Sequence, residues 1–484
     1  MTEHASTLIE LLQRRAVEGA DRVAYVHREE RVTWGELWRD AETLARGLHR
    51  AGAQTGERVA LLLPAGLDLI RLFWAIQRTG AAAVIFNPTV PPQTAAARAV
   101  RVRPRLVVTS PHTLDCDGPL PPLSTSSEDL AFLQPTSGTS GEPRAVMIRH
   151  RNVLAVLRAS AAINLTRDDV LVSWVPPWHD LGLVRFVAGT AFVGARCHTV
   201  EPAVRTIPEW LATISSQRAT ITGAPDFAYR LASRLVDPRT VDITSLRYAT
   251  NGAEPVRLDT ITTFEERFGL RDVVAPGYGL AEATLGVTIV RPGEPVRTDA
   301  RGNVSCGRPF DGVTVRLENG EILVRSEGVF AGYFDAEEET ARVLRDGWLH
   351  TGDTGSLDAD GHLYVLGRTK SMLKRGGSVL APRELEEVAQ RVRGVNVAAA
   401  VGIARNGTEE IVVAIEAEGD SAAIAANVAE SLREAMGFVP ERVVVVERRG
   451  IPRTHNGKVR HDLLRTSLRD GAVAIVHDTS ESVR

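Results

Sequence analysis

A strand–helix–strand pattern near the amino terminus is the feature that most constrains the fold of this chain. Residues 58–63 and 81–86 are short apolar runs, and residues 67–79 between them have the spacing of an amphipathic helix. Two strands joined through a helix lie parallel in one sheet. Further strand-like segments lie at 106–109, 130–133, 171–175, 195–200 and 219–222. We therefore predict an α/β protein whose amino-terminal part is built from doubly wound βαβ subdomains.

The pattern changes after residue 369 to that of a small α+β domain. Helical spacing at 383–391 and 422–436 alternates with strand-like runs at 397–402, 410–416 and 442–446. A chain of 484 residues is also too long for one ordinary domain. We predict a large, multi-sheet amino-terminal domain of residues 1–369, a small mobile domain of 370–470, and a loose tail of 471–484.

Two local signals support this reading. Thr33 and Glu36 have the spacing of a capping box ahead of the helical segment 34–51, which follows a first helical segment at 8–17. Asn319 and Gly320 lie between two strand-like runs in 313–325 and predict a hairpin of the Asn-Gly type.

Composition excludes several classes of function. The net charge of −3 does not point to nucleic acid or an anionic membrane. No run approaches the roughly 20 apolar residues of a membrane span, so we expect no membrane insertion. The three cysteines are scattered, which argues against a disulfide framework and for a reducing compartment. We expect a cytoplasmic protein.

Lysine is nearly absent from this chain. Only Lys370, Lys374 and Lys458 occur among 57 basic residues, all in the last quarter. A lysine ammonium is a compact, mobile point charge, whereas the arginine guanidinium is a planar fork. Codon bias could leave three lysines by chance, but their clustering favours a role that arginine cannot fill.

A loop of small hydroxyl residues and glycines follows the apolar run at 130–133. It reads Thr136-Ser137-Gly138-Thr139-Ser140-Gly141-Glu142-Pro143-Arg144. Backbone amides and hydroxyls in such a loop can surround phosphate oxygens. The loop lacks the Gly-Lys-Ser/Thr ending of a P-loop, and similar loops serve as linkers. Its place between a strand and a helix expected near Arg151 favours phosphate binding.

This loop resembles the phosphate-binding signature of the adenylate-forming superfamily, which includes acyl-CoA synthetases, fatty acyl-AMP ligases, luciferases and peptide-synthetase adenylation domains. The resemblance covers nearly the whole chain, because further motifs follow in the family's order. They are Trp174-Val175-Pro176-Pro177-Trp178-His179-Asp180, Asn251-Gly252-Ala253-Glu254-Pro255, Gly277-Tyr278-Gly279-Leu280-Ala281-Glu282-Ala283-Thr284, Thr351-Gly352-Asp353, Gly367-Arg368-Thr369-Lys370 and Pro452-Arg453-Thr454-His455-Asn456-Gly457-Lys458.

The resemblance implies an ATP site. Its expected ATP-binding residues are Thr136, Ser137, Gly138, Thr139, Ser140, Arg144, Asn251, Gly252, Ala253, Tyr278, Gly279, Thr284, Asp353 and Arg368. Within this set, Asp353 and Arg368 would hold the ribose, Tyr278 would face adenine, and Thr136 and Thr284 would place hydroxyls on phosphate. Glu282, with Thr136, would hold Mg²⁺, a cation that prefers oxygen ligands.

The resemblance also implies which residues carry the chemistry. Lys458 would offset the repulsion between the substrate carboxylate and the α-phosphate and stabilise the transition state. Lys370 would be the hinge about which the small domain rotates between half-reactions. His179 and Glu282 would complete the catalytic group. The acyl pocket would draw on Gly223, Ala224, Asp226 and Leu280.

The thiol acceptor is the least determined part of the expected reaction. The segments at 222–229, 251–257 and 279–284 look most like fatty acyl-AMP ligases, which deliver acyl groups to carrier proteins. The extra segment that those ligases carry before Thr351-Gly352-Asp353 is absent here, and its absence favours CoA. Trp178-His179-Asp180 stands where an amino-acid anchor would lie, which counts against an α-amino acid substrate. We expect CoA as the acceptor, with a carrier protein as the alternative.

The chain departs from the family pattern at two further places: Arg144-Ala145 replaces the usual Lys-Gly, and Ala281 replaces a common threonine. Two rival readings also stay open. One is a non-catalytic copy that binds nucleotide or an acyl ligand, but the presence of Lys458, Glu282 and Asp353 together speaks against it. A dinucleotide-binding enzyme would need Gly-x-Gly-x-x-Gly after the first strand, and the chain has none.

Overall fold

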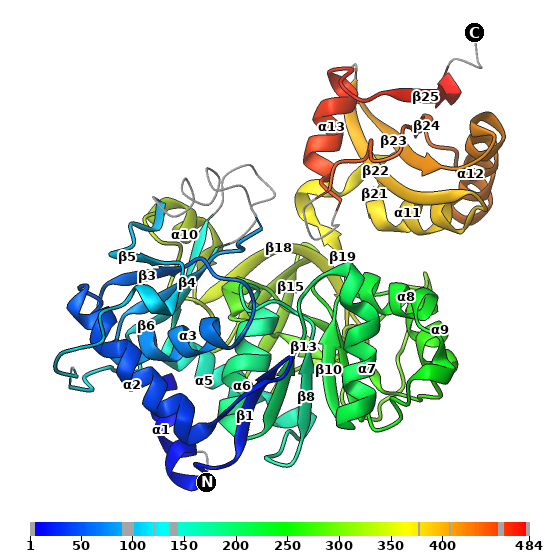
Figure 1. The fold of residues 1–484 in the computed structure, drawn as a ribbon. Coiled ribbons are helices and arrows are strands. Elements are labelled where there is room, and N and C mark those ends of the chain that lie inside the picture. Colours follow the sequence, from blue (N-terminus) through cyan, green and yellow to red (C-terminus); the bar gives the residue numbers. More distant parts are fainter. Residues whose placement is uncertain are drawn as a thin grey trace.

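The computed structural model describes residues 5–89, 101–120, 122–135, 144–375, 378–405, 408–453 and 459–480. In it the chain forms a large body and a smaller unit that lies against one side of the body (Figure 1). Each part has its own sheets and its own hydrophobic core.

The largest sheet has nine strands in the order β14-β13-β12-β11-β10-β8-β9-β1-β2. Strands β12, β11, β10, β8, β9 and β1 run parallel, and the strands at both edges are antiparallel. The bounds are β1 Val23–His27, β2 Glu30–Thr33, β8 Val170–Ser173, β9 Arg196–Thr199, β10 Ile221–Ala224, β11 Tyr248–Asn251, β12 Val274–Tyr278, β13 Thr288–Ile289 and β14 Arg308–Pro309.

Two further sheets complete the body. One has the order β5-β3-β4-β6-β7, with β3 Arg58–Leu61, β4 Ala82–Ile85, β5 Leu106–Val108, β6 Leu130–Pro135 and β7 Ala145–Arg149. The other has the order β15-β16-β18-β17, with β19 also paired to β18. Its bounds are β15 Thr314–Glu318, β16 Glu321–Arg325, β17 Leu344–Arg345, β18 Trp348–Leu357 and β19 Leu363–Arg368.

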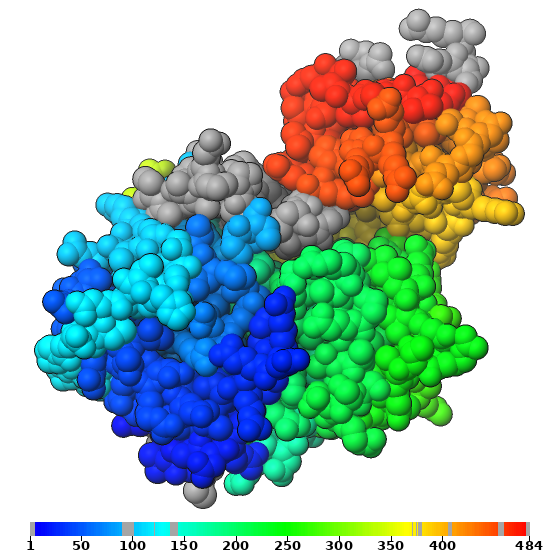
Figure 2. Space-filling model, viewed as in Figure 1, coloured from blue at the N-terminus to red at the C-terminus, as the bar shows by residue number. Residues whose placement is uncertain are grey.

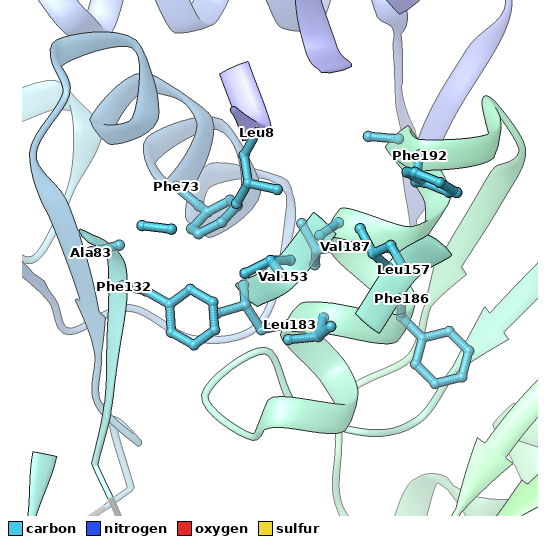
Figure 3. Close-up of a cluster of buried hydrophobic side chains, with 14 of the residues drawn as sticks. Leu8, Phe73, Ala83, Phe132, Val153, Leu157, Leu183, Phe186, Val187 and Phe192 are labelled. Carbon is cyan, nitrogen blue, oxygen red and sulfur yellow. The ribbon is translucent and has the colours of Figure 1, made fainter. Parts of the chain in front are cut away.

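Helices cover these sheets on both faces. Those of the body are α1 Leu8–Glu18, α2 Trp34–Arg50, α3 Leu67–Thr79, α5 His150–Ala159, α6 Gly189–Val193, α7 Ile207–Gln217, α8 Asp226–Leu235, α9 Leu258–Phe268 and α10 Glu337–Val343, with a π-helical segment η3 at Leu181–Ala188. The first core packs α1, α3, α5, η3 and α6 between the nine-stranded sheet and the β5-β3-β4-β6-β7 sheet (Figure 3). The second core packs α7, α8 and α9 on the opposite face of the nine-stranded sheet.

The smaller unit is an α+β fold. Its sheet has the order β22-β23-β24-β25 and is accompanied by the hairpin β20-β21. The bounds are β20 Leu373–Arg375, β21 Ser378–Leu380, α11 Pro382–Arg391, β22 Val395–Arg405, β23 Thr408–Ala417, α12 Ser421–Met436, β24 Arg442–Val446, α13 His461–Arg469 and β25 Ile475–Asp478. Arg383 on α11 donates to the Val256 carbonyl of the body, and Arg301 pairs with Glu384 at 3.3 Å. Figure 2 shows the orange and yellow surface of this unit against the green part of the body.

The local patterns predicted the elements around them correctly. Strands β3 and β4 pair in parallel through α3, as the opening strand–helix–strand pattern predicts. Thr33 and Glu36 form both hydrogen bonds of the capping box. Glu318 pairs with Glu321, and Asn319 and Gly320 have φ angles of 50° and 81°, which is the conformation of a two-residue hairpin turn.

One strand was not predicted and one sequence expectation is wrong. The helix expected near Arg151 begins at His150 as α5, but the unpredicted strand β7 lies between the Ser/Thr/Gly loop and this helix and pairs antiparallel with β6. The tail expected from Gly471 onward is not loose, because β25 pairs antiparallel with β24 and the Asp478 carboxylate accepts from Arg442 Nε at 3.1 Å. The ordered chain therefore extends to at least residue 480.

Candidate active site

The candidate residues gather where parallel strands of the nine-stranded sheet end. Ala224 ends β10, Asn251 ends β11, and Tyr278 ends β12. In open α/β sheets ligands bind at the carboxyl ends of parallel strands. Three of the motifs singled out in the sequence thus meet at one edge, although more than 50 residues separate the first from the last.

Tyr278, Asp353 and Arg368 form one hydrogen-bonded group. The Tyr278 hydroxyl donates to Asp353 Oδ2 at 2.6 Å, and Arg368 Nε lies 2.8 Å from Asp353 Oδ1. Arg368 also donates to the Thr351 carbonyl at 3.1 Å. β18 supplies the aspartate and the neighbouring β19 supplies the arginine at the paired position. The carboxylate is therefore fixed from two sides.

The Asp353 carboxylate keeps its two neighbours, Tyr278 and Arg368, in their protonated forms. Burial raises the pKa of Tyr278, and the Asp353 carboxylate beside it raises that pKa further, so the phenol remains a hydrogen-bond donor. The Arg368 side chain is 45% exposed. Its partial burial lowers its pKa, but the charges of Asp353 and, further away, Glu282 outweigh this effect and raise the pKa. Glu282 thus lies within electrostatic range of the same arginine.

Glu282 belongs to a second group next to the first. The Tyr333 hydroxyl donates to Glu282 Oε1 at 2.7 Å, and the Arg144 guanidinium lies 5.0 Å from the centre of the Tyr333 ring. Burial raises the pKa of Tyr333, and the adjacent Glu282 carboxylate adds to this effect. Sequence reasoning missed Tyr333 altogether. It enters the site because the segment around it pairs with β7, with Phe334 donating to the Ala145 carbonyl at 2.9 Å.

Backbone conformation fixes the segment that carries Glu282. A Cβ atom on Gly279 would lie 1.6 Å from the Leu285 carbonyl oxygen, so only glycine fits there. Thr284 has a φ angle of 66°, which is rare for a β-branched residue. Its hydroxyl is buried and donates to the Gly328 carbonyl at 2.6 Å. This hydroxyl points into the protein, so the structure gives Thr284 a role in holding the segment and not the expected phosphate contact.

The loop after β11 is held by a buried carboxylate. Asn251 Nδ2 donates to Asp226 Oδ1 at 3.2 Å, and Thr260 and the Arg257 amide also donate to Asp226 at 2.9 and 3.1 Å. Burial raises the pKa of Asp226 although these donors oppose it. With both oxygens occupied and 2% exposure, Asp226 organises the scaffold instead of facing the acyl pocket as expected.

The backbone that follows Asn251 packs closely against the neighbouring strand β12. A Cβ on Gly252 would lie 3.0 Å from the Gly277 carbonyl oxygen, and Ala253 is exposed with a φ angle of 68°. Of the other expected pocket residues, Gly223 and Ala224 are buried in β10 and Leu280 is half-buried.

His179 lies at the start of η3. Its Nδ1 atom is 2.6 Å from Asp180 Oδ1, and the imidazole is 34% exposed. Burial tends to raise the pKa of Asp180, but the neighbouring His179 and backbone donors lower it overall. A Cβ on Gly182 would lie 2.1 Å from the Pro176 carbonyl oxygen, which makes glycine necessary at this bend. Gln134, next to the end of β6, donates to the Trp178 carbonyl at 2.8 Å and links this segment to the strand before the Ser/Thr/Gly loop.

Several expected site residues lie outside the described residues. They are Thr136, Ser137, Gly138, Thr139, Ser140 and Lys458, together with the side chain of Lys370. The described residues beside Lys458 are firmly placed: Arg453 and Val459 form a β-bridge, Arg460 donates to the Pro452 carbonyl at 2.9 Å, and Arg453 pairs with the buried Glu416.

Within the described ranges, no three His, Cys, Asp or Glu side chains come together as a metal site. A single carboxylate such as Glu282 suits Mg²⁺ that is held mainly by substrate phosphates and water. None of the helices in the same ranges combines the length and apolar composition that a bilayer crossing requires.

Comparison with known proteins agrees with this geometry. Residues 12–121 and 110–334 match the family of AMP-binding enzymes. A medium-chain-fatty-acid–[acyl-carrier-protein] ligase of Moorena producens is 28% identical over an alignment of 578 positions that covers 97% of this chain and 96% of the relative. A putative fatty-acid–CoA ligase of Mycobacterium tuberculosis is 29% identical, with 94% and 96% covered.

A solved structure of the fatty acyl-adenylate ligases from E. coli and L. pneumophila is similar over the whole length. It has a TM-score of 0.86 and 25% identity, and the match covers 97% of this chain and 98% of the other. The sequence match, the fold and the grouped site residues identify an acyl-AMP-forming ligase. The chain belongs to the family of AMP-binding enzymes.

Proposed function

We propose that this enzyme activates a carboxylic acid with ATP, releases pyrophosphate, and transfers the acyl group from the acyl-adenylate to the thiol of CoA. The observation that carries the proposal is the pair of adjacent groups around Asp353 and Glu282. Asp353 is fixed by two donors, which suits a carboxylate that grips ribose hydroxyls. Glu282 is fixed by Tyr333 and lies within electrostatic range of Arg368, which suits a Mg²⁺ contact near the phosphates.

Each group of candidate residues would have a separate role in adenylation. Asp353 and Arg368 would position the ribose, while the loop of 136–140 and Arg144 would receive the phosphates. Mg²⁺ bound through Glu282 and Thr136 would neutralise phosphate charge. Lys458 would lie between the substrate carboxylate and the α-phosphate and stabilise the charge that develops in the in-line attack. His179, beside Asp180, would lie between the acyl pocket and the exit of pyrophosphate.

A tight turn supports CoA as the acceptor. Arg345 and Trp348 pair across a two-residue turn at Asp346 and Gly347, whose φ angles are 51° and 75°. This turn lies where fatty acyl-AMP ligases carry their extra segment. The alignment with the Moorena producens ligase has 578 positions against 484 residues here, so that relative contains segments that this chain lacks. Without such a segment, the small unit is free to rotate about Lys370 for the second half-reaction.

A carrier-protein thiol is the second candidate. It is favoured by the name of the Moorena producens relative, which spans almost the whole of this chain. A fatty acid is the substrate class that the relatives' names suggest for either acceptor.

One incubation tests both proposals. Purified protein is mixed with ATP, Mg²⁺, CoA and a pool of carboxylic acids, and products are identified by mass spectrometry. Acyl-CoA with AMP and pyrophosphate is the expected result. Acyl-AMP without thioester would overturn the CoA proposal, and a second incubation with a phosphopantetheinylated carrier protein would then test the alternative. Absence of acid-dependent pyrophosphate release with every acid would contradict adenylation itself.

A further inference from the structure

A row of small side chains crosses the nine-stranded sheet directly beneath the candidate site. Ser173 pairs with Gly223, Gly223 with Thr250, and Thr250 with Ala275. These residues share one face of the sheet, and Gly223 and Thr250 lie one position before the ends of β10 and β11. The small side chains let η3 pack closely on this face of the sheet.

Phe186 of η3 lies over the centre of this row. A Cβ on Gly223 would be 3.3 Å from the Phe186 ring and 3.3 Å from Thr250 Cβ, so Gly223 faces the ring directly. Figure 3 shows the Phe186 side chain pointing away from Phe132 and Leu183, toward the green strands. The ring therefore packs directly on the sheet at Gly223.

Arg185, the residue before Phe186, is buried with no hydrogen-bond or ion-pair partner in the part of the chain that the structure describes. It is 4% exposed, and its Nε and Nη1 atoms have no hydrogen-bond partner among the described residues. The group that acts on its charge is Tyr248, and burial lowers the pKa of Arg185. Tyr248 is two residues before Thr250 on the same face of β11, so the group that acts on the charge of Arg185 lies at the inner end of the small-residue row.

A buried arginine without a counter-charge is unfavourable. Desolvation of a guanidinium is offset only by a close anion or several hydrogen bonds. The buried carboxylate of Asp226 is engaged elsewhere, by Asn251, Thr260 and Arg257. Arginine is also the side chain best shaped to bind a carboxylate with two parallel hydrogen bonds. The missing partner is thus most simply an anion that arrives with the substrate.

We propose that the acid activated by this enzyme carries a second carboxylate at its far end, and that Arg185 receives it beneath the row Ser173, Gly223, Thr250 and Ala275. The substrate would be a dicarboxylic acid: one carboxylate is adenylated at the mouth of the site, and the other pairs with Arg185 inside. This inference rests on the proposed adenylation and adds the substrate class to it.

The test compares acids of equal chain length. Linear monocarboxylic and dicarboxylic acids are supplied at each length, and acid-dependent pyrophosphate release gives kcat/KM. Wild-type enzyme is expected to prefer the dicarboxylic acid at its best length. Arg185→Met is expected to lose on the order of a hundredfold in kcat/KM for that acid and to keep its activity with the monocarboxylic acid. Arg234→Met, on the exposed face of α8, is the matched control and should change neither value.

A second measurement tests whether Arg185→Met loses activity only because its fold is destabilised. Replacing an unpaired buried charge by an apolar side chain leaves a protein as stable or makes it more stable. Ligand-free Arg185→Met should therefore unfold at the same temperature as wild type or higher, and only wild type should be stabilised by the dicarboxylic acid. A wild-type preference for monocarboxylic acids, or a strongly destabilised Arg185→Met, would overturn the inference. Failure of wild type to turn over any acid would instead count against the proposed adenylation.

Discussion

At the residue scale, two tyrosine hydroxyls hold the two acidic groups of the site. Tyr278 donates to Asp353 at 2.6 Å and Tyr333 donates to Glu282 at 2.7 Å. Each hydroxyl is a donor to a charged acceptor, and such hydrogen bonds contribute more than neutral ones. The two hydrogen bonds are alike in chemistry. Under the proposed function, the first positions the carboxylate for the ribose and the second positions the carboxylate for Mg²⁺.

Replacing each tyrosine by phenylalanine should separate these functions. We expect Tyr278→Phe to raise the KM for ATP on the order of tenfold, because Asp353 loses a donor while the ring remains. Tyr333→Phe should instead raise the Mg²⁺ concentration needed for half-maximal activity, since Glu282 is freed to move. Steady-state kinetics over ATP and Mg²⁺ measure both effects, and each variant is the control for the other. Identical profiles for the two variants would contradict the assignment.

His150 should make stability depend on pH. It is fully buried at the start of α5, where its Nδ1 accepts from the Leu8 amide at 3.1 Å, and burial lowers its pKa to about 4 from 6.5. The folded protein thus binds this proton less readily than the unfolded chain does. The contribution of His150 is complete above pH 6.5 and is lost as pH falls toward about 4.

Urea unfolding of wild type and His150→Gln checks this prediction. Between neutral pH and about one unit below the ordinary histidine pKa, wild type should lose about 1 kcal/mol more unfolding free energy than the variant. His198 is another buried histidine whose pKa is about 4, and it is present in both proteins. Its titration therefore changes the unfolding free energy of both equally and cancels when their pH dependences are compared. Equal pH dependence in both proteins would show that His150 does not titrate as described.

The site residues that the sequence revealed are those that occur within motifs. Tyr278, Glu282, Asp353 and Arg368 each lie in a short run of distinctive neighbours, and the structure brings them together. Tyr333 has no such run around it. Its position depends on the antiparallel pairing of 331–334 with β7, and a contact of that kind arises from the fold and leaves no local pattern.

At the scale of elements, periodicity predicted the helices α1, α2, α3, α11 and α12 and the strands β3, β4, β22, β23 and β24, but not the helices α7, α8 and α9 or the buried strands β11 and β12. It missed β7, the five residues Ala145–Arg149 between the Ser/Thr/Gly loop and the helix expected near Arg151, which the sequence pattern left without an assignment. It missed β25 because Ile475–Asp478 has two exposed apolar residues and a polar end, which resembles a loose terminus. As an edge strand, β25 buries few side chains, so its pattern is weak although its backbone is paired.

The pairing of β25 has a measurable effect on stability. We expect truncation after Ala474 to lower the melting temperature of the small unit by at least about 5 °C, because β24 loses one of its two neighbouring strands and Arg442 loses the Asp478 carboxylate. Truncation after Ser480 keeps β25 and should leave that temperature unchanged. Thermal unfolding followed by circular dichroism compares the two proteins, and equal melting temperatures would contradict a stabilising role for β25.

At the scale of the whole molecule, the proposed cycle depends on a lysine that the small unit carries to the body. Lys458→Ala should slow acid-dependent pyrophosphate release on the order of a hundredfold, because no other group replaces the charge between carboxylate and α-phosphate. Transfer from supplied acyl-AMP to CoA should change only a few-fold. Rapid-mixing assays of each half-reaction measure the two rates separately. An equal loss in both would show that Lys458 supports the fold or both steps.

The two parts of the molecule have cores with no residue in common. The buried clusters of the body contain no residue beyond Leu363, and those of the small unit begin at Leu373. The chain passes between them once, and the polar contacts between them that the structure describes are few and lie around α11. A hybrid protein joined between Leu363 and Leu373 would therefore keep both hydrophobic cores intact. Such hybrids, joining this body to the small unit of a relative, would show whether acid choice and acceptor choice are inherited as independent modules.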